Sequence, residues 1–463
     1  MHTASRVTAF LLPATALALG IAGALAVGPA QASGFQLREN SVKNLGRANA
    51  GTAVAKGDAS VVANNPAAMV NLDKTTVQVD ATDIDLTAKF SGSGTSALGT
   101  PLSGGDGGDP GSPQVVPALA AVTAFGNFRL GASINAPFGL KTQYDADWVG
   151  RYNAIKSDVK TVDFTVSGAW AITDRFSLGL GVIHQRTEVT LTNALDFGTA
   201  LCIGASPTNP ALTCANPAFP FHPQSADGAV SVHGSDNSWG WVAGMQWRPA
   251  DNFTIGYSHH SKIDHTLTGN ADFTVPASVA GALGAGAPAD GRIYAPLTTP
   301  TIDTLSAQWD VTAQFRLLGD IQRTGWHSLQ QVAIFNADGS PLGHPEEFNW
   351  RNTTYVGIGA EWDLSPQFTL RAGLAHDQSP TSDATRDARL PDNTRKLYSI
   401  GATWHASDAF SIDAAFQRID IDDPSIDVVS PFPGSPSPAL GSRLTGKYNG
   451  HANLIGLAMQ YRF

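Results

Sequence analysis

Charged residues are scarce in this chain. Lysine, arginine, aspartate and glutamate together make up 15% of its 463 residues, whereas an ordinary soluble domain carries about 25%. The formal net charge is −10 and neither sign is concentrated in runs, which argues against a nucleic-acid partner. The length would allow two or three soluble domains, but no linker-like change of composition divides the chain, and one large barrel accommodates it equally well.

Long apolar runs are absent after residue 32, so the sequence predicts no transmembrane helix beyond that point. The first 32 residues contain one fixed positive charge, Arg6, followed by the apolar run Val7–Val27 and the cleavage pattern Ala30-Gln31-Ala32. This order is typical of a secretory signal peptide. The alternative, an N-terminal anchor, fits less well because Pro13 and many alanines and glycines dilute the run. We expect residues 1–32 to be removed by cleavage near Ala32.

Cysteine is nearly absent, since Cys202 and Cys214 are the only two. In an exported chain, two cysteines this close within one loop suggest a disulfide, with two free thiols as the alternative. Their spacing is poor for a metal site, and no nearby pair of histidines completes one. The sequence therefore predicts neither a metal nor a cofactor.

Catalytic patterns are also scarce. His259 and His260 are adjacent on a predicted strand and so face opposite sides, His265 is expected at a strand end, and Glu346-Glu347 is expected to be a solvated acidic pair. The stretch "GTAVAKGDAS" (51–60) lacks the G-K-[ST] sequence and the preceding strand of a phosphate loop. No G-x-S-x-G sequence or convincing Ser/His/Asp grouping is found. The sequence does not favour an enzyme.

What the chain does contain is an alternation of period two. In "FSLGLGV" (176–182) apolar side chains occupy one face and serine and glycine the other, and "FTIGYS" (253–258), "FTLRAGLA" (368–375) and "FSIDAAF" (410–416) repeat the pattern. A soluble β-sandwich would show the same alternation. We predict fourteen strands, at 75–86, 115–124, 127–135, 158–171, 174–190, 236–249, 251–267, 300–310, 312–324, 350–362, 366–376, 395–405, 408–420 and 450–463.

The connections between these strands distinguish a barrel from a sandwich. Short turns join strands 2 and 3, 4 and 5, 6 and 7, 8 and 9, 10 and 11, and 12 and 13, and every other link is long and rich in Gly, Pro, Asn and Asp. Strict alternation of short and long links is typical of an up-and-down barrel with short periplasmic turns and long extracellular loops. The even strand count agrees with this interpretation.

Aromatic residues flank the short turns at a constant spacing. A phenylalanine follows a tryptophan by six residues in the pairs Trp170 and Phe176, Trp247 and Phe253, Trp309 and Phe315, Trp362 and Phe368, and Trp404 and Phe410. Such repetition places a ring of aromatics at one membrane interface. The chain ends in the alternating segment "LIGLAMQYRF", which suits a lipid-facing last strand. The predicted fold is therefore an all-β, 14-stranded antiparallel transmembrane barrel in the bacterial outer membrane.

The segment before the first strand contains Gly34-Phe35, Leu45-Gly46-Arg47-Ala48, Asp58-Ala59 and Asn65-Pro66-Ala67, in that order. With these motifs it resembles the N-terminal region of the FadL-type outer-membrane transporters of long-chain fatty acids and aromatic hydrocarbons (OmpP1/FadL/TodX). The resemblance continues through "APFGLKTQY" (136–144), "SWGWVAGMQW" (238–247), "LRAGLAHDQSP" (370–380) and "LPDNTRKLYSIGATW" (390–404). It covers essentially the whole mature chain.

The resemblance implies a hatch, residues 33–73, that closes the lumen of a barrel formed by residues 74–463. The residues that carry the hatch motif here are Phe35, Leu45, Gly46, Arg47, Asn65, Pro66 and Ala67. The resemblance also implies passive uptake, with capture by long loops, binding in an apolar pocket, hatch movement and lateral release through a kink in the third strand.

That kink falls on Pro137, Phe138 and Gly139. Independently of the family, proline cannot donate to a sheet ladder and glycine weakens one, so a break is expected here. The alternative from the residues alone is that Pro137 only starts a long loop.

The best-known members of the family place basic residues near the fatty carboxylate, in the loop after the fifth strand and in the stretch after the ninth. The matching stretches here, "LTNALDFG" (191–198) and "HSLQQVAIF" (327–335), carry no basic residue that aligns. Arg316 and Arg371 are predicted to face the lumen, where arginines more often pair with carboxylates than bind ligands. An uncharged hydrocarbon is therefore an alternative substrate. A non-transporting adhesin or phage receptor is the alternative from another class, although such a protein has no need of a hatch.

As partners we expect a long-chain fatty acid or another hydrophobic small molecule, the lipid and lipopolysaccharide of the outer membrane, and the barrel assembly machinery during biogenesis. The chain is expected to be a monomer.

Overall fold

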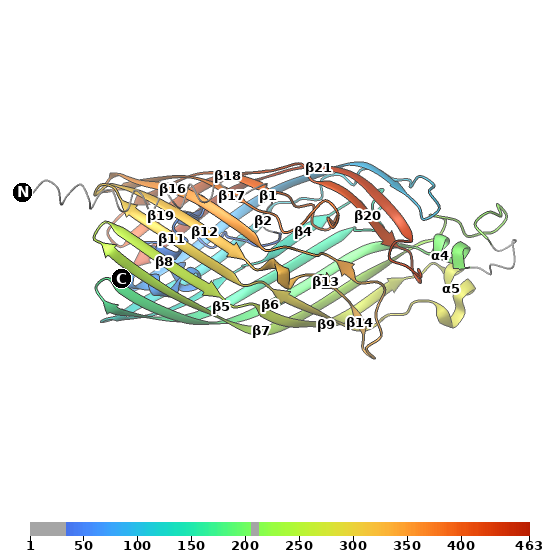
Figure 1. Cartoon of the computed structure of the whole chain (residues 1–463), viewed down its shortest axis with the longest axis horizontal. Coiled ribbons are helices and arrows are strands. Elements are labelled where there is room, and N and C mark those ends of the chain that lie inside the picture. The colour runs from blue at the N-terminus through green and yellow to red at the C-terminus, as the bar shows by residue number, and fades with distance from the viewer. Residues whose placement is uncertain (1–33, 205–212) are drawn as a thin grey trace, which may run out of the picture.

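A long β-barrel accounts for most of the molecule (Figure 1). The computed structural model describes residues 34–204 and 213–463, so the predicted signal peptide and its cleavage site near Ala32 lie outside the described residues. Short turns gather at one end of the barrel, and the long loops with helices α4 (Phe197–Gly204) and α5 (Ala277–Leu283) lie at the other (Figure 1). This division of turns and loops between the two ends agrees with the alternation of link lengths in the sequence.

Fourteen antiparallel strands form the wall, as predicted. The continuous strands are β1 (Thr76–Thr95), β2 (Gln114–Phe125), β5 (Lys156–Thr173), β6 (Phe176–Asp196), β7 (Asp227–Ala250), β12 (Phe315–Thr324), β16 (Thr353–Ser365), β17 (Phe368–Asp377), β18 (Arg395–His405) and β21 (Gly441–Arg462). The interrupted strands are β3 (Phe128–Asn135) with β4 (Gly139–Gln143), β8 (Phe253–His260) with β9 (Ile263–Thr274), β10 (Gly291–Thr299) with β11 (Ile302–Asp310), and β19 (Phe410–Ile421) with β20 (Ser425–Pro431).

The barrel closes between its first and last strands. β1 pairs with β21 from Thr76 opposite Arg462 to Thr95 opposite Arg443. The remaining strands pair with their neighbours in chain order, except that β4 pairs with β5 and not with β2, so the barrel is closed apart from this break in the third strand. A closed antiparallel barrel satisfies its backbone groups internally, which is the condition for crossing a bilayer with strands.

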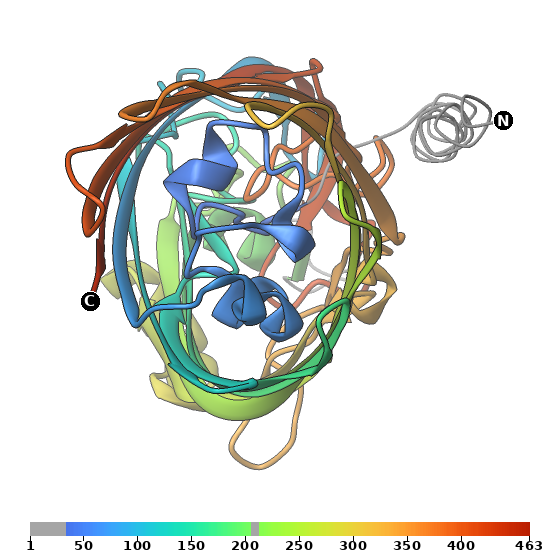
Figure 2. The same ribbon diagram turned by 90° about the vertical axis from the view of Figure 1, so that its left-hand side faces the viewer.

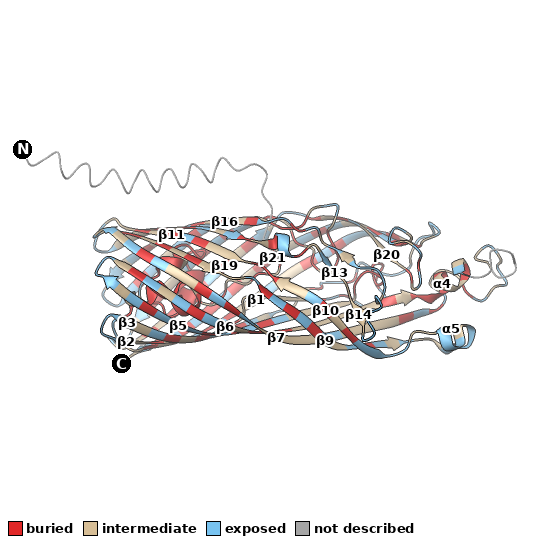
Figure 3. Ribbon diagram, turned by 60° about the horizontal axis from the view of Figure 1, so that its bottom comes forward, coloured by how far each residue is buried: buried red, intermediate tan, exposed pale blue. Residues whose placement is uncertain are grey.

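The outer face of the barrel is apolar. Exposed and buried residues alternate along the strands (Figure 3), and in β21 the exposed set includes Ile455, Leu457, Met459 and Tyr461. Trp170, Trp247, Trp362 and Trp404 lie exposed beside the short turns, which supports the predicted aromatic ring. No helix in the described part of the chain is long and apolar enough to span a membrane.

Several strands are longer than the apolar alternation predicts. β1 continues to Thr95, β7 begins at Asp227 and β21 begins at Gly441. Their loop-side halves are polar but still paired, as β1 is with β21. Backbone ladders need no apolar side chains, so the hydrophobic pattern marks only the part of each strand that faces lipid.

The remaining short elements lie in the loops and in the lumen. The loops contain η4 (Gly284–Gly286), η5 (Trp326–Ser328), β13 (Gln331–Val332), β14 (Phe335–Asn336) and β15 (Glu346–Glu347). The lumen contains α2 (Val42–Leu45), η1 (Thr52–Val54), α3 (Val61–Asn64) and η2 (Pro66–Asn71).

The position expected for His265 was wrong. β7 pairs Val242 with His260 but Ser235 with Thr268, so the β8–β9 strand contains one extra residue, a β-bulge. The bulge shifts the alternation by one residue and turns His265 to the inside, where it is buried. Its Nδ1 lies 3.0 Å from an Asp236 carboxylate oxygen and its Nε2 lies 3.0 Å from Gln185 Oε1.

Candidate functional site

The N-terminal segment, residues 34–73, lies inside the barrel (Figure 2). Its helical turns α2, η1, α3 and η2 contact strands on opposite sides of the wall. Leu45, Val54, Val61 and Met69 are fully buried although the segment contains no helix longer than six residues. Because such short helices are unstable alone, the barrel wall must hold this conformation.

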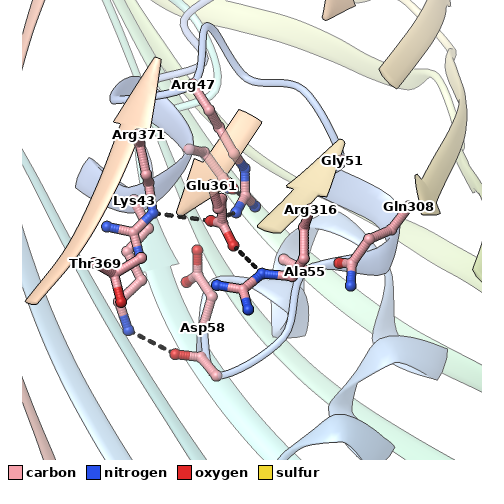
Figure 4. A network of polar contacts seen from close by, with 12 residues as sticks. Lys43, Arg47, Gly51, Ala55, Asp58, Gln308, Arg316, Glu361, Thr369 and Arg371 are labelled. Carbon is pink, nitrogen blue, oxygen red and sulfur yellow. Dashed lines mark hydrogen bonds and ion pairs between the residues drawn. The ribbon is translucent and has the colours of Figure 1, made fainter. Parts of the chain in front are cut away.

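Buried charges connect this segment to the wall (Figure 4). Arg47 pairs with Glu361, and the same carboxylate accepts from Arg371 Nε at 2.8 Å and Arg316 Nε at 3.1 Å. Asp80 accepts from the Val42 N–H at 2.8 Å. A buried ion cluster adds little net stability over an apolar core, but removing one partner leaves an unpaired charge and costs about 3–5 kcal/mol.

Glycines on the inner face let the segment approach the strands closely. A methyl group on Gly179 would lie 2.3 Å from Ala67 N, and one on Gly244 would lie 1.8 Å from Asn65 Oδ1. Gly46 lies against Gly401 so closely that a Cβ on Gly401 would lie 2.8 Å from the Gly46 Cα. Other strand glycines that approach the segment in this way are Gly131, Gly256, Gly359, Gly373 and Gly456.

The Asn65-Pro66-Ala67 turn begins the 3₁₀ helix η2. Asn65 caps it by accepting from the Ala67 N–H at 3.2 Å, while its Nδ2 donates to the Ala53 carbonyl at 2.6 Å and to the Met245 carbonyl at 3.2 Å. Pro66 occupies the first helical position, where a missing N–H costs nothing. The turn therefore fixes two parts of the segment to each other and to β7.

The third strand is interrupted where Pro137 and Gly139 stand. β3 pairs with β2 up to Leu119 opposite Ile134, whereas β4 pairs with β5 only, within the described residues. The N-terminal segment takes the vacant place: the Leu37 N–H donates to the Pro137 carbonyl at 2.8 Å and the Gly139 N–H donates to the Phe35 carbonyl at 2.9 Å. A small space of about 80 Å³ borders this patch, and Leu37 and Pro137 are among the residues that line it.

A cavity of about 680 Å³ lies between the N-terminal segment and the long loops. Such a volume is within the range of small-molecule sites, and its lining is mainly apolar. The lining includes Phe35, Leu140, Leu191, Leu297, Trp350 and Leu390.

Aromatic rings close the cavity on the side of the strand break. The Phe35 ring lies 5.8 Å from Phe138, 4.9 Å from Trp326 and 5.6 Å from Trp350, centroid to centroid. Phe138, between Pro137 and Gly139, is turned inward and buried. Phe35 thus lines the cavity and also belongs to the stretch that pairs with the strand break.

The structure brings only part of the predicted residues to the cavity. Arg316 and Arg371 do not line it; Arg316 pairs with Glu361 and Asp363, and Arg371 pairs with Glu361. Cys202, in α4, and Cys214 are joined by a disulfide in the loops, as the sequence suggested. No cluster of metal-ligating side chains occurs among residues 34–204 and 213–463.

The expectation for Glu346 was wrong. Instead of being solvated it is half-buried, lines the cavity, and lies near Asp387 of another loop. The cause is the packing of two long loops, which no local pattern reveals.

The family follows from comparison with known proteins. A family profile described as "Outer membrane protein transport protein (OMPP1/FadL/TodX)" matches residues 23–463. The chain belongs to this family. Members of the OmpP1/FadL/TodX family are outer-membrane transport proteins and not enzymes.

Relatives within the OmpP1/FadL/TodX family match along nearly their whole length. Outer membrane protein P1 of Haemophilus influenzae is 30% identical over 96% of this chain and 98% of its own. The long-chain fatty acid transport protein of Escherichia coli is 28% identical over 87% of this chain and 90% of its own. The crystal structure of a Pseudomonas aeruginosa FadL homologue superimposes with a TM-score of 0.85 at 27% identity, over 93% of this chain and all of that one.

One group of residues, the inner-face glycines, and one single residue, Arg389, were missed in the sequence. The glycines that approach the N-terminal segment alternate along their strands with lipid-facing residues. Their position on the inner face could therefore have identified them. Arg389, which lines the cavity, comes from the loop between β17 and β18, and no spacing rule connects that loop to β5 or β6.

Proposed function

We propose that this protein takes up long-chain fatty acids or similar hydrophobic molecules passively across the outer membrane. The observation that carries this proposal is the largely apolar cavity of about 680 Å³ inside a barrel whose outer face suits lipid. Burying an acyl chain releases about 0.8 kcal/mol per CH₂, so a long chain binds there without specific polar contacts. The chain acts as a monomer, is inserted by the barrel assembly machinery, and contacts membrane lipid and lipopolysaccharide.

The proposed route runs from the long loops to the cavity and then sideways into the bilayer. The N-terminal segment acts as the hatch, with Leu45, Gly46, Arg47 and the Asn65-Pro66-Ala67 turn holding it in the lumen. Phe35 separates the cavity from the interrupted third strand. Displacement of residues 35–37 would open the path past Pro137, Phe138 and Gly139.

Uptake by whole cells tests this proposal. Expression in a strain that lacks its own fatty-acid transporter should restore growth on oleate. Gly139→Val should abolish oleate uptake, because a larger side chain would fill the break beside Leu37, whose Cδ1 would lie 2.9 Å from an added Cβ. Barrel assembly, read from heat-modifiable electrophoretic mobility, should be unchanged.

The matched control is Gly168→Val. Gly168 faces lipid, and the nearest atom to an added Cβ is 4.0 Å away. This variant should transport normally. Unchanged uptake in Gly139→Val would contradict lateral release, and failure to grow on oleate despite correct insertion would favour a hydrocarbon as substrate.

A further inference from the structure

One basic side chain, Arg389, lies in the apolar cavity. It is the only lysine or arginine among the described residues that line it. It belongs to the loop between β17 and β18, which folds back onto the opposite wall, and its Nη2 donates to Asn193 Oδ1 at 3.1 Å. A guanidinium in such surroundings requires an explanation, because burying a charge is costly unless it is paired.

Among the described residues, this guanidinium donates hydrogen bonds only to neutral acceptors. Besides Asn193, it donates to the Lys156 carbonyl at 3.4 Å and to Ser157 Oγ at 3.5 Å, both at the outer limit of a hydrogen bond. Six other arginines of the described interior have carboxylate partners, whereas Arg129, near the short turns, donates to carbonyl oxygens such as that of Leu72. These pairs are Arg38 with Asp377, Arg47 with Glu361, Arg151 with Asp227, Arg316 with Glu361 and Asp363, Arg371 with Glu361, and Arg395 with Asp392.

The backbone around Arg389 is held in place from several sides. Thr142 Oγ1 donates to the Arg389 carbonyl at 3.0 Å, and the Arg389 N–H donates to Asp387 Oδ1 at 2.6 Å. The Tyr144 hydroxyl donates to the Ala388 carbonyl at 2.7 Å. The side chain is therefore carried by a fixed stretch of loop, which lowers the entropy cost of using it to bind a ligand.

Two carboxyl groups, those of Glu346 and Asp387, lie near Arg389 and near each other. Burial and the neighbouring Asp387 raise the pKa of Glu346 well above its ordinary value, which favours the uncharged form of Glu346. Asp387 Oδ1 accepts from the backbone of Arg389 rather than from its guanidinium. Two other titratable groups belong to the lining: His344 is bonded through Nε2 to the Ser435 carbonyl, and the Tyr152 hydroxyl donates to Asp227 Oδ1 at 2.6 Å.

We propose that Arg389 binds the carboxylate of a monoanionic ligand whose apolar chain fills the cavity. A carboxylate can accept two parallel N–H bonds from a guanidinium, and three weak or neutral bonds leave donors of Arg389 available. Leu390, the next residue, packs in the same cluster as Phe35 and Trp350, so the chain of the ligand extends from Arg389 toward the strand break. This inference rests on the proposed function and names the head group that the site selects.

Paired ligands test the proposal. Binding of oleate and of oleyl alcohol, which share one chain and differ in head-group charge, is measured with the purified full-length protein at fixed micelle concentration. Arg389→Gln should weaken oleate binding at least tenfold and leave oleyl alcohol binding within twofold. Arg389→Lys, which keeps the charge but loses the fork, should fall between the wild type and Arg389→Gln for oleate.

The matched control is Arg351→Gln. Arg351 also donates only to carbonyl oxygens, those of Ser379 and Thr381, but it lies outside the cavity, so both ligands should bind as in the wild type. Equal oleate binding by the wild type and Arg389→Gln would overturn the head-group assignment while leaving hydrophobic uptake intact. Binding of neither ligand by the wild type would overturn the proposed function as well.

Discussion

At the scale of single residues, Asp58 shows how charge holds the N-terminal segment together inside the lumen. Burial alone would raise the pKa of Asp58, but Lys43, the Ser41 hydroxyl and Arg47 outweigh it and hold that pKa below its ordinary value, 3.8. Ser41 Oγ donates to Asp58 Oδ2 at 2.6 Å, and Gln78 of β1 donates to Oδ1 at 3.0 Å. The ionised carboxylate therefore stabilises the packed segment.

The sign of the pH dependence follows from this lowered pKa. A carboxyl group with a depressed pKa in the folded state contributes stability above its ordinary value of 3.8, and the contribution is lost as the pH falls below it. We expect the amides of residues 34–73 to exchange faster at pH 3 than at pH 7, after correction for intrinsic rates, while amides of the barrel strands stay protected. Hydrogen exchange with mass spectrometry measures this.

Asp58→Asn provides the control. In this variant the amides of residues 34–73 should already exchange faster at pH 7, because Lys43 loses the nearby negative charge. These amides should also lose less protection on acidification than in the wild type. An equal loss of protection in both proteins would rule out Asp58 as the source of the pH dependence.

Individual residues were predictable where one chemical argument applies. Arg316 and Arg371 were expected to pair with carboxylates from their place on the inner face, and both do. Glu346 and Arg389 were not predictable as cavity residues, since their positions depend on how separate loops fold onto the barrel. Such contacts join residues hundreds of positions apart, as in the bond between Thr142 and Arg389.

At the scale of elements, the third strand is completed by a piece of chain that is not part of the wall. Residues 35–37 supply the hydrogen bonds that β2 does not give to the stretch from Pro137 to Gly139. This patch contains two backbone bonds, whereas β2 and β3 share a ladder from Leu119 to Phe125. The patch is therefore the weaker part of this strand, as segments with few bonds open at low free-energy cost.

Leu37→Pro tests the weakness of this patch. Proline removes the N–H that the Pro137 carbonyl accepts, which costs about 0.5–1.5 kcal/mol for the bond alone. The Gly139 amide should then exchange several times faster, while the amides of β3 that pair with β2 stay unchanged as an internal reference. Leu37→Ala keeps the N–H and should leave the Gly139 amide nearly as protected as in the wild type; equal acceleration in both variants would argue against the backbone bond.

The elements show which signals a sequence carries. The alternation of link lengths predicted the number of strands, and the aromatic spacing marked the end of the barrel that carries the short turns. Both patterns are set by the way strands cross a membrane and meet its interfaces. The break at Pro137 was predictable from proline chemistry. The bulge between His260 and Ile263 was not, because Ser261 and Lys262 carry no breaker signal, and this bulge places His265 on the inner face instead of at a strand end.

At the scale of the whole molecule, the barrel is too wide to be filled by its own inward side chains. Eight strands enclose a lumen that side chains fill, whereas 16 to 18 strands leave an aqueous channel. Fourteen strands lie near the wide end of that range. The glycines that face the lumen widen it further, and the N-terminal segment occupies the space that they leave.

Removing that segment should therefore open a water-filled pore. In planar bilayers the wild type should conduct weakly, and a variant lacking residues 34–73 should give large, stable conductance steps, since the exposed charges Glu361, Arg316 and Arg371 would hydrate.

The deleted variant could fail to assemble, and a change in its heat-modifiable electrophoretic mobility would reveal this failure. Gly401→Val therefore serves as a second variant. Its side chain would displace the Gly46 backbone, which lies 2.8 Å from an added Cβ, and should raise conductance without any deletion. Gly168→Val, on the lipid face, should conduct like the wild type. Low conductance in both the deletion and Gly401→Val, with intact barrels, would mean that side chains and loops alone close the lumen.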